Sequence, residues 1–220
     1  MNKIKTDQQY IRVVTQAASC FVNFLRGLLS KEQDEEEATE ILLPYAKDVL
    51  DTLSTLFNGS LQVNYFPLQE ETLSSLSLLA TILDKEFAPY YPLIMPGLKQ
   101  IFNNPNVSST DLKSQAIQTM GYLISSVSDQ SETFMNDFRE ILDAFVKVLV
   151  TLPDEDPQVP ALINAFVHIS TAMKEKFYDY LKVLFPILEK YMRADIDFKL
   201  EDADISEFRK EETKESVNVI

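Results

Sequence analysis

Two stretches of the chain, residues 87–102 and 177–192, share one pattern of apolar side chains. Two weaker copies fit the same pattern, so that the four copies begin at Leu42, Phe87, Phe134 and Phe177. Each copy has apolar residues at offsets 0, 7, 8, 11, 14 and 15, which lie along one face of an α-helix. Successive copies begin 45, 47 and 43 residues apart, a period typical of solenoids built from helical hairpins. The sequence therefore predicts a repeat protein.

This period predicts an all-α fold, a right-handed α-solenoid of about four HEAT repeats, in which each repeat is a hairpin of two helices. We expect the repeats over residues 1–58, 67–103, 109–150 and 157–193, and an acidic loop or disordered tail over residues 194–220. The helices at both ends keep apolar faces that would pack against a neighbour. We therefore expect the chain to be a fragment of a longer superhelix.

The first repeat gives three local predictions. A helix over residues 6–29 should have Cys20, as a buried structural thiol, beside an apolar stripe of Val13, Val14, Ala17, Phe21, Leu25 and Leu28. The connector over residues 31–40 holds six carboxylates and one lysine, and should be a solvated loop or else a contact for a basic partner. A second helix over residues 41–57 should end at Asn58-Gly59-Ser60, because glycine favours a helix C-terminus.

Prolines mark the second helices of the later repeats. Pro89 and Pro92 fit the first turn of a helix, where a missing amide hydrogen costs little. Pro96 and Pro186 lie in mid-helix at the same position of two repeats, and should kink both helices there.

The charge balance restricts the partners. Asp and Glu outnumber Lys and Arg by 34 to 20, which gives a net charge of −14. Such a surface repels nucleic acid and anionic lipid and attracts basic ligands, so we expect no nucleic acid and no membrane partner. The alternative is that the acidity only keeps the chain soluble. The single cysteine and the lack of a signal peptide or a long apolar run predict a soluble intracellular protein.

The residues that carry catalytic or metal chemistry are scarce. His168 is the single histidine and shares the polar side of its helix with Asn164 and Thr171, so we expect it to be exposed. One histidine and one cysteine form no metal cluster and no nucleophile–base pair, and the four glycines form no phosphate-binding loop. We therefore expect neither an enzyme nor a bound metal or cofactor.

Several motifs resemble one known family. These are the block over residues 87–102, FAPYYPLIMPGLKQIF, and the segments Leu43-Pro44-Tyr45, Asp154–Val159 (DEDPQV) and Phe177–Leu181 (FYDYL). They look like the middle of karyopherin-β proteins, most of all the karyopherin β-3 (importin β-3) branch of the importin-β superfamily. The resemblance covers roughly residues 42–193. The family's members are several times longer, and the acidic run over residues 34–37 is longer than the usual turn at this place.

The resemblance implies a segment of a nuclear transport receptor that moves between cytoplasm and nucleus. In that family HEAT repeats form a superhelix whose second helices line the concave face. Nuclear localisation signals of basic cargo proteins and the GTPase Ran bind inside, and phenylalanine–glycine nucleoporins bind on the convex side. The N-terminal repeats that dominate Ran binding are not present here. The alternative is a HEAT-repeat scaffold or regulatory subunit that is unrelated to transport.

Carboxylates on the second helices are the candidate cargo site. Positions off the apolar columns should look into the concave channel, where they could bind lysine and arginine side chains of a cargo signal. These positions are Asp48, Asp51, Asp137, Glu140, Asp143, Asp179 and Glu189. For each residue taken alone, a solvated helix face is the alternative.

Overall fold

The computed structural model describes residues 8–30, 35–105, 107 and 109–193, which form helices joined by short turns and include no strand. The α-helices are α1 (Gln8–Leu28), α2 (Glu35–Leu42), α3 (Ala46–Gln62), α4 (Phe66–Leu83), α5 (Tyr91–Asn103), α6 (Thr110–Ser126), α7 (Ser131–Thr151), α8 (Gln158–Met173) and α9 (Tyr178–Met192). Short 3-10 helices cover Leu43–Tyr45, Asp84–Phe87, Ser128–Gln130 and Lys174–Phe177. The predicted all-α solenoid of HEAT repeats is confirmed. The chain divides into two compact units, Met1–Asp179 and Tyr180–Ile220.

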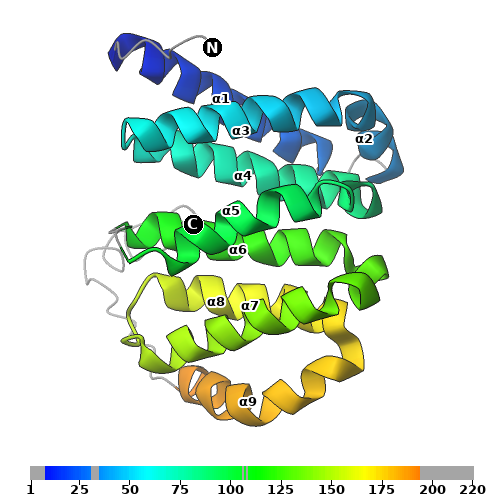
Figure 1. Cartoon of the computed structure of the whole chain (residues 1–220), viewed down its shortest axis with the longest axis vertical. Coiled ribbons are helices and arrows are strands. Elements are labelled where there is room, and N and C mark those ends of the chain that lie inside the picture. Colours follow the sequence, from blue (N-terminus) through cyan, green and yellow to red (C-terminus); the bar gives the residue numbers. More distant parts are fainter. Residues whose placement is uncertain (1–7, 31–34, 106, 108, 194–220) are drawn as a thin grey trace, which may run out of the picture. The chain divides into compact units, whose positions relative to one another are not determined.

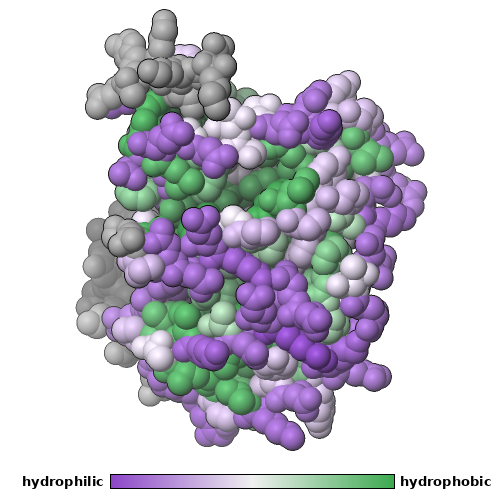
Figure 2. All heavy atoms as spheres, viewed as in Figure 1, coloured by the Kyte–Doolittle hydropathy of each residue, from purple (hydrophilic) through white to green (hydrophobic). Residues whose placement is uncertain are grey.

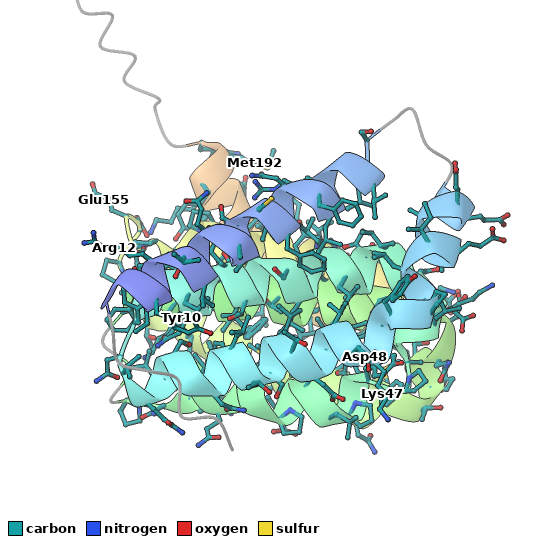
Figure 3. All side chains as sticks on the ribbon, turned by 90° about the horizontal axis from the view of Figure 1, so that it is seen from above. Tyr10, Arg12, Lys47, Asp48, Glu155 and Met192 are labelled. Carbon is teal, nitrogen blue, oxygen red and sulfur yellow. The ribbon has the colours of Figure 1, made fainter. Side chains whose placement is uncertain are left out.

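Within the first unit the helices form two layers (Figure 1). Helices α1, α4, α6 and α8 pack side by side in chain order, and we call them the first-helix layer. Helices α3, α5 and α7 pack against α4, α6 and α8 respectively, and we call them the second-helix layer. The short helix α2 also packs against α4. In the view from above, α1 and α3 lie on opposite sides (Figure 3).

Small residues allow close contact within the first-helix layer. A side-chain carbon added to Gly121 of α6 would lie 3.1 Å from the Cα atom of Ala165 in α8. Between α4 and α6, the Ser77 hydroxyl donates a hydrogen bond of 3.0 Å to the Oγ1 atom of Thr119. These hydroxyls are buried but also bond their own helix backbones, so that their polar groups are satisfied. The first helices are therefore held together at short range.

Aromatic rings join the second helices α5 and α7. The ring of Tyr91 lies 4.6 Å from that of Phe134, and the ring of Phe102 lies 5.1 Å from that of Phe145. Tyr91 and Phe145 are almost completely buried. Aromatic pairs in tilted or edge-on geometry add to the stabilisation that burial alone supplies. The seam between α5 and α7 is thus filled by large side chains rather than by close backbones.

Two of the hairpins begin with the same backbone turn. Helix α4 ends at Asp84 (φ 43°) and helix α8 ends at Lys174 (φ 52°), and a 3-10 turn follows each of them. These turns place Phe87 and Phe177, the first residues of the two strongest repeat copies, in the core. Non-glycine residues seldom adopt a positive φ. The sequence repeat therefore includes the turn geometry as well as the apolar stripe.

The apolar stripe that the sequence predicts for α1 is partly wrong. The buried residues of α1 are Ile11, Ala18, Val22, Leu25 and Leu28, whereas Val13 is 67% exposed. Ala17 and Cys20 are also exposed, so the thiol is not buried. Apolar residues occur on more than one side of this helix, and the contact with α4 decides which side is buried. Sequence periodicity alone could not make that choice.

The segment between α1 and α4 also differs from its prediction. Residues 35–40 belong to helix α2, because Ala38 and Leu42 give that segment a buried face; residues 31–34 of the expected loop lie outside the described residues. Pro44 disfavours helical geometry in the residue before it, so the expected single helix over residues 41–57 is divided into α2 and α3.

The predicted helix stop at Gly59 is wrong as well. Helix α3 continues to Gln62, and Asn64 (φ 50°) supplies the left-handed residue after its end. Asparagine tolerates this conformation better than most residues. Pro92 does lie in the first turn of α5, and Pro96 and Pro186 lie inside α5 and α9 as predicted. The kinks at these two prolines stay a prediction, and the tail over residues 194–220 lies outside the described residues.

We expect Gly121→Leu to lower the free energy of unfolding by about 1–3 kcal/mol, because the new side chain would be forced against the backbone of α8. Gly97→Ala is the matched control, since no atom lies within 4 Å of the position where its new carbon would be. That variant should be more stable than the original chain by about 1 kcal/mol, from helix propensity alone. Urea denaturation of the three proteins measures both effects, and equal stability of the two variants would contradict the close contact.

Candidate functional site

The predicted cargo-binding carboxylates all lie on second helices. Helix α3 carries Asp48 and Asp51, helix α7 carries Asp137, Glu140 and Asp143, and helix α9 carries Asp179 and Glu189. All are exposed except Asp137 and Glu189, which are half-buried. Lys47 and Asp48 lie on the outward side of α3, near its N-terminal end (Figure 3). Glu189 belongs to the second unit, where it accepts hydrogen bonds of 3.0 and 2.6 Å from the guanidinium group of Arg193.

Two of these carboxylates share one lysine of the preceding repeat. The Nζ atom of Lys99, on α5, donates hydrogen bonds to Oδ1 of Asp137 and, over 2.9 Å, to Oε2 of Glu140. The Tyr91 hydroxyl donates a 2.6 Å hydrogen bond to the other oxygen of Asp137. Asp137 therefore accepts from both a lysine and a tyrosine of α5. We call these four residues the Lys99 cluster.

The electrostatics of the Lys99 cluster favour a charged lysine. Partial burial alone would lower the pKa of Lys99, but hydrogen bonds to Asp137 and Glu140 and their negative charges outweigh it, so that the pKa is raised. Burial, followed by the hydrogen bond to Asp137, raises the pKa of the Tyr91 hydroxyl, which stays protonated and donates. The cluster is thus a lysine-binding arrangement whose carboxylates lie one helical turn apart.

A second lysine bridges the next pair of repeats. Lys176, in the 3-10 turn before α9, forms an ion pair with Glu132 at the start of α7. The hydrogen bond and the charge of Lys176 lower the pKa of Glu132. Since Glu132 is exposed, this pair contributes little to stability. Both lysines nevertheless bind carboxylates on the same helix, α7.

The exposed carboxylates of α3 and α7 occupy equivalent repeat positions. Counted from the first residues of their repeat copies, Asp48 and Asp51 correspond to Glu140 and Asp143. At the position of Asp48 and Glu140, helix α5 has Leu93, which is 76% exposed. The outward surface of the second helices therefore changes from acidic to apolar and back to acidic between successive repeats.

A different acidic hollow lies on the first helices α1, α4 and α6. It has a volume of about 420 Å³, and its lining includes Glu70, Glu71, Asp111 and Arg26. Burial, and then repulsion from Asp111 and Glu71, raises the pKa of Glu70. In the described part of the chain, no group of three or more histidine, cysteine or acidic residues has a geometry that could hold a metal ion. Over the same residues, no helix is both long and apolar enough to span a membrane.

His168 differs from its predicted exposure. Its ring lies half-buried on α8, with its centre 4.5 Å from that of the Tyr122 ring on α6. The close approach of α8 to Gly121 brings the two rings together. Burial lowers the pKa of His168, so the ring is held in its neutral form. Sequence pattern placed it correctly away from the main stripe but could not show that α6 covers it.

Sequence reasoning also missed Lys99 and Tyr91 as partners of the candidate site. Tyr91 was assigned only to the aromatic block, and Lys99 was given no role. The available signal was that Lys99 is the only basic residue of the block over residues 87–102. Which carboxylates it binds depends on the neighbouring helix, which the repeat alone does not reveal.

Asp137→Ala should lower the free energy of unfolding by about 1–3 kcal/mol, because it leaves the buried Tyr91 hydroxyl without its acceptor and Lys99 with one carboxylate. Asp143→Ala, on the same helix but exposed, should change it by less than about 0.5 kcal/mol. Urea denaturation measures both variants. A similar small effect of the two would show that the cluster contributes nothing to folding.

The lowered pKa of His168 predicts a pH dependence of stability. Between pH 7 and pH 5.5, the unfolded chain takes up a proton on this ring (ordinary pKa about 6.5) before the folded chain does, so the fold loses stability as the pH falls. His168→Phe keeps a ring against Tyr122 and removes the titration. Its melting temperature relative to the original chain should rise as the pH is lowered through this range, and a constant difference would contradict the burial.

Comparisons with known proteins agree with this geometry. A family model described as "Importin subunit beta-1-like, TPR repeats" matches residues 61–213. A "Probable importin-5 homolog" of Dictyostelium discoideum is 27% identical over 159 residues, which cover 72% of this chain and 15% of that protein. "Importin subunit beta-3" of Saccharomyces cerevisiae is 25% identical over 178 residues, 80% of this chain and 15% of that protein. No solved structure gives a significant match.

The chain thus spans about 15% of the length of the curated relatives it matches. Its first helices α4, α6 and α8 begin at Phe66, Thr110 and Gln158, a spacing of about 45 residues that fits HEAT repeats better than the 34-residue TPR. The matched region includes the Lys99 cluster and most of both layers. The chain belongs to the importin subunit beta-1-like family of helical-repeat proteins.

Proposed function

We propose that this chain is a segment of a nuclear transport receptor of the importin-β kind, and that its second helices bind lysine- and arginine-rich localisation signals of cargo proteins. The family and the importin relatives support the receptor role. The observation that supports the chemistry is the Lys99 cluster, in which two carboxylates one turn apart on a second helix hold a lysine side chain. A lysine of a cargo signal could be held in the same manner.

The carboxylates that remain accessible are the ones we assign to the cargo. Asp48 and Asp51 repeat the one-turn spacing of Asp137 and Glu140 on another second helix. Asp48, Asp51 and Asp143 are exposed, and no residue of the described ranges forms an ion pair with them. Asp137 is already engaged by Lys99 and Tyr91, so we assign it a structural role in the receptor rather than direct cargo contact.

Several modest contacts could then act together on one extended signal. A charge-assisted hydrogen bond between an ammonium group and a carboxylate is stronger than a neutral one, although exposure and salt weaken it. When a single peptide spans several repeats, each further contact forms at a high effective concentration. Asp179 and Glu189 would extend such a surface along α9. The mechanism requires no catalysis, metal or cofactor.

The wider transport role follows the family and is likewise a proposal. The parent receptor would shuttle between cytoplasm and nucleus, with Ran bound mainly by repeats outside this segment and with phenylalanine–glycine nucleoporins as further partners. A HEAT-repeat scaffold unrelated to transport is the competing function. The two differ in whether the acidic second helices recognise a basic signal selectively.

The experiment compares two triple variants that lose the same charge. Asp48→Ser/Asp51→Ser/Asp143→Ser removes the accessible carboxylates of the second helices, and Glu86→Ser/Asp129→Ser/Glu155→Ser removes exposed carboxylates of the turns. Fluorescence anisotropy with a lysine-rich localisation peptide at near-physiological salt should show binding that the first variant weakens by about tenfold or more, and the second much less.

Circular dichroism should show equal helix content in both variants, because all six residues are exposed. Equal weakening by the two variants would mean that the peptide senses only a diffuse negative field. No selective binding over a charge-scrambled peptide would favour the scaffold function instead.

A further inference from the structure

An open apolar groove lies between the second helices α3 and α5. Its volume is about 330 Å³, and Leu73 and Leu76 of α4 form its floor. Phe57 and Leu61 line the side of α3, and Leu93 and Leu98 line the side of α5. Figure 2 shows the apolar side chains that gather along the strip between these helices.

The repeat explains why this groove is open while the seam between α5 and α7 is filled. Tyr91 and Lys99 of α5 bridge to α7, and the residues at the same repeat positions of α3 are Ala46 and Ser54. Neither of these can reach across to α5. The space that a tyrosine and a lysine occupy in one seam is therefore vacant in the other.

Gly97 enlarges the groove from the side of α5. It lies within the helix, where glycine costs about 1 kcal/mol relative to alanine. No atom lies within 4 Å of the position that a side-chain carbon would take, so the chain's own packing does not require a glycine here. The consequence of the missing side chain is a slot beside Leu93, which is 76% exposed.

The lining of the groove is uncharged, in a chain of which 25% of the residues are charged. In the filled seam the carboxylates of Asp137 and Glu140 receive a lysine, whereas their counterparts across the open groove are Tyr90 and Leu93. A basic side chain would find no partner there. The amides of Asn58 and Gln100, both exposed at the rim, offer donors and acceptors to a peptide backbone.

We propose that the groove between α3 and α5 binds an uncharged, extended segment of a partner protein through a phenylalanine or leucine side chain inserted beside Gly97. The inserted side chain takes the place that Tyr91 has in the neighbouring seam, and the rim amides bind the segment's backbone. This site needs none of the carboxylates assigned to basic signals, so it does not rest on the proposed function. It adds a second kind of ligand to the same layer of helices.

The test uses the whole 220-residue chain and a labelled neutral peptide in which phenylalanine residues alternate with glycine and serine. Anisotropy titration should show binding that changes little with salt, because no charges are involved. Replacing the phenylalanines of the peptide by alanine should abolish it. Gly97→Leu should weaken it by roughly tenfold to a hundredfold by occupying the slot.

Gly27→Leu is the matched control, since its position on α1 also has no atom within 4 Å and lies outside the groove. It should bind the neutral peptide as the original chain does. Urea denaturation verifies that both leucine variants are folded. Unchanged binding by Gly97→Leu, or no binding of the neutral peptide by the original chain, would overturn the proposal.

The lysine-rich peptide distinguishes this site from the proposed function. Gly97→Leu should bind it normally, and the triple variant of Asp48, Asp51 and Asp143 should bind the neutral peptide normally. Loss of both ligands in Gly97→Leu would overturn a separate site. Sedimentation would reveal a second copy of this chain as the occupant, if the chain formed a dimer that Gly97→Leu dissociates; that result would also overturn the proposal.

Discussion

The close approach of the first helices is the constraint on which the rest of this structure depends. Gly121 lets α6 and α8 come together, and the hydroxyls of Ser77 and Thr119 meet between α4 and α6. Because each first helix is fixed against the next, the second helices that pack on them are held in a set order. The position of every functional candidate on α3, α5 and α7 follows from that order.

The second helices use one set of repeat positions for different purposes. At the position of Tyr91, helix α3 has Ala46; at the position of Lys99 it has Ser54. The first pair fills a seam with an aromatic ring and an ion pair, and the second pair leaves a groove. A repeat scaffold can thus change from self-contact to ligand contact by side-chain size alone, without any change of backbone.

The fold was largely predictable from the sequence because it depends on local periodicity. The apolar columns and the turn before Thr110, where Ser109 caps α6 over 3.1 Å, indicated most helices within a few residues. The stripe of α1 and the stop at Gly59 were mispredicted, since helix faces and ends there are decided by α4 and by Asn64. Such choices depend on tertiary contacts that a single helix does not encode.

The candidate site was less predictable. The sequence identified the carboxylates of the second helices, but the lysine that two of them bind comes from another repeat. Residues 38 positions apart in Lys99 and Asp137 meet only because α5 and α7 are neighbours in space. The open groove had still less signal, because it consists of side chains that are absent or small.

The turns that follow α4 and α8 have a consequence for how sequence variation in this protein should be interpreted. Asp84 and Lys174 are exposed, so a substitution there would ordinarily be regarded as neutral. Their φ angles of 43° and 52° make the backbone, rather than any neighbour, the restricting factor. Glycine relieves the strain and β-branched residues increase it. At these two surface positions, tolerance to mutation is therefore governed by conformation and not by burial.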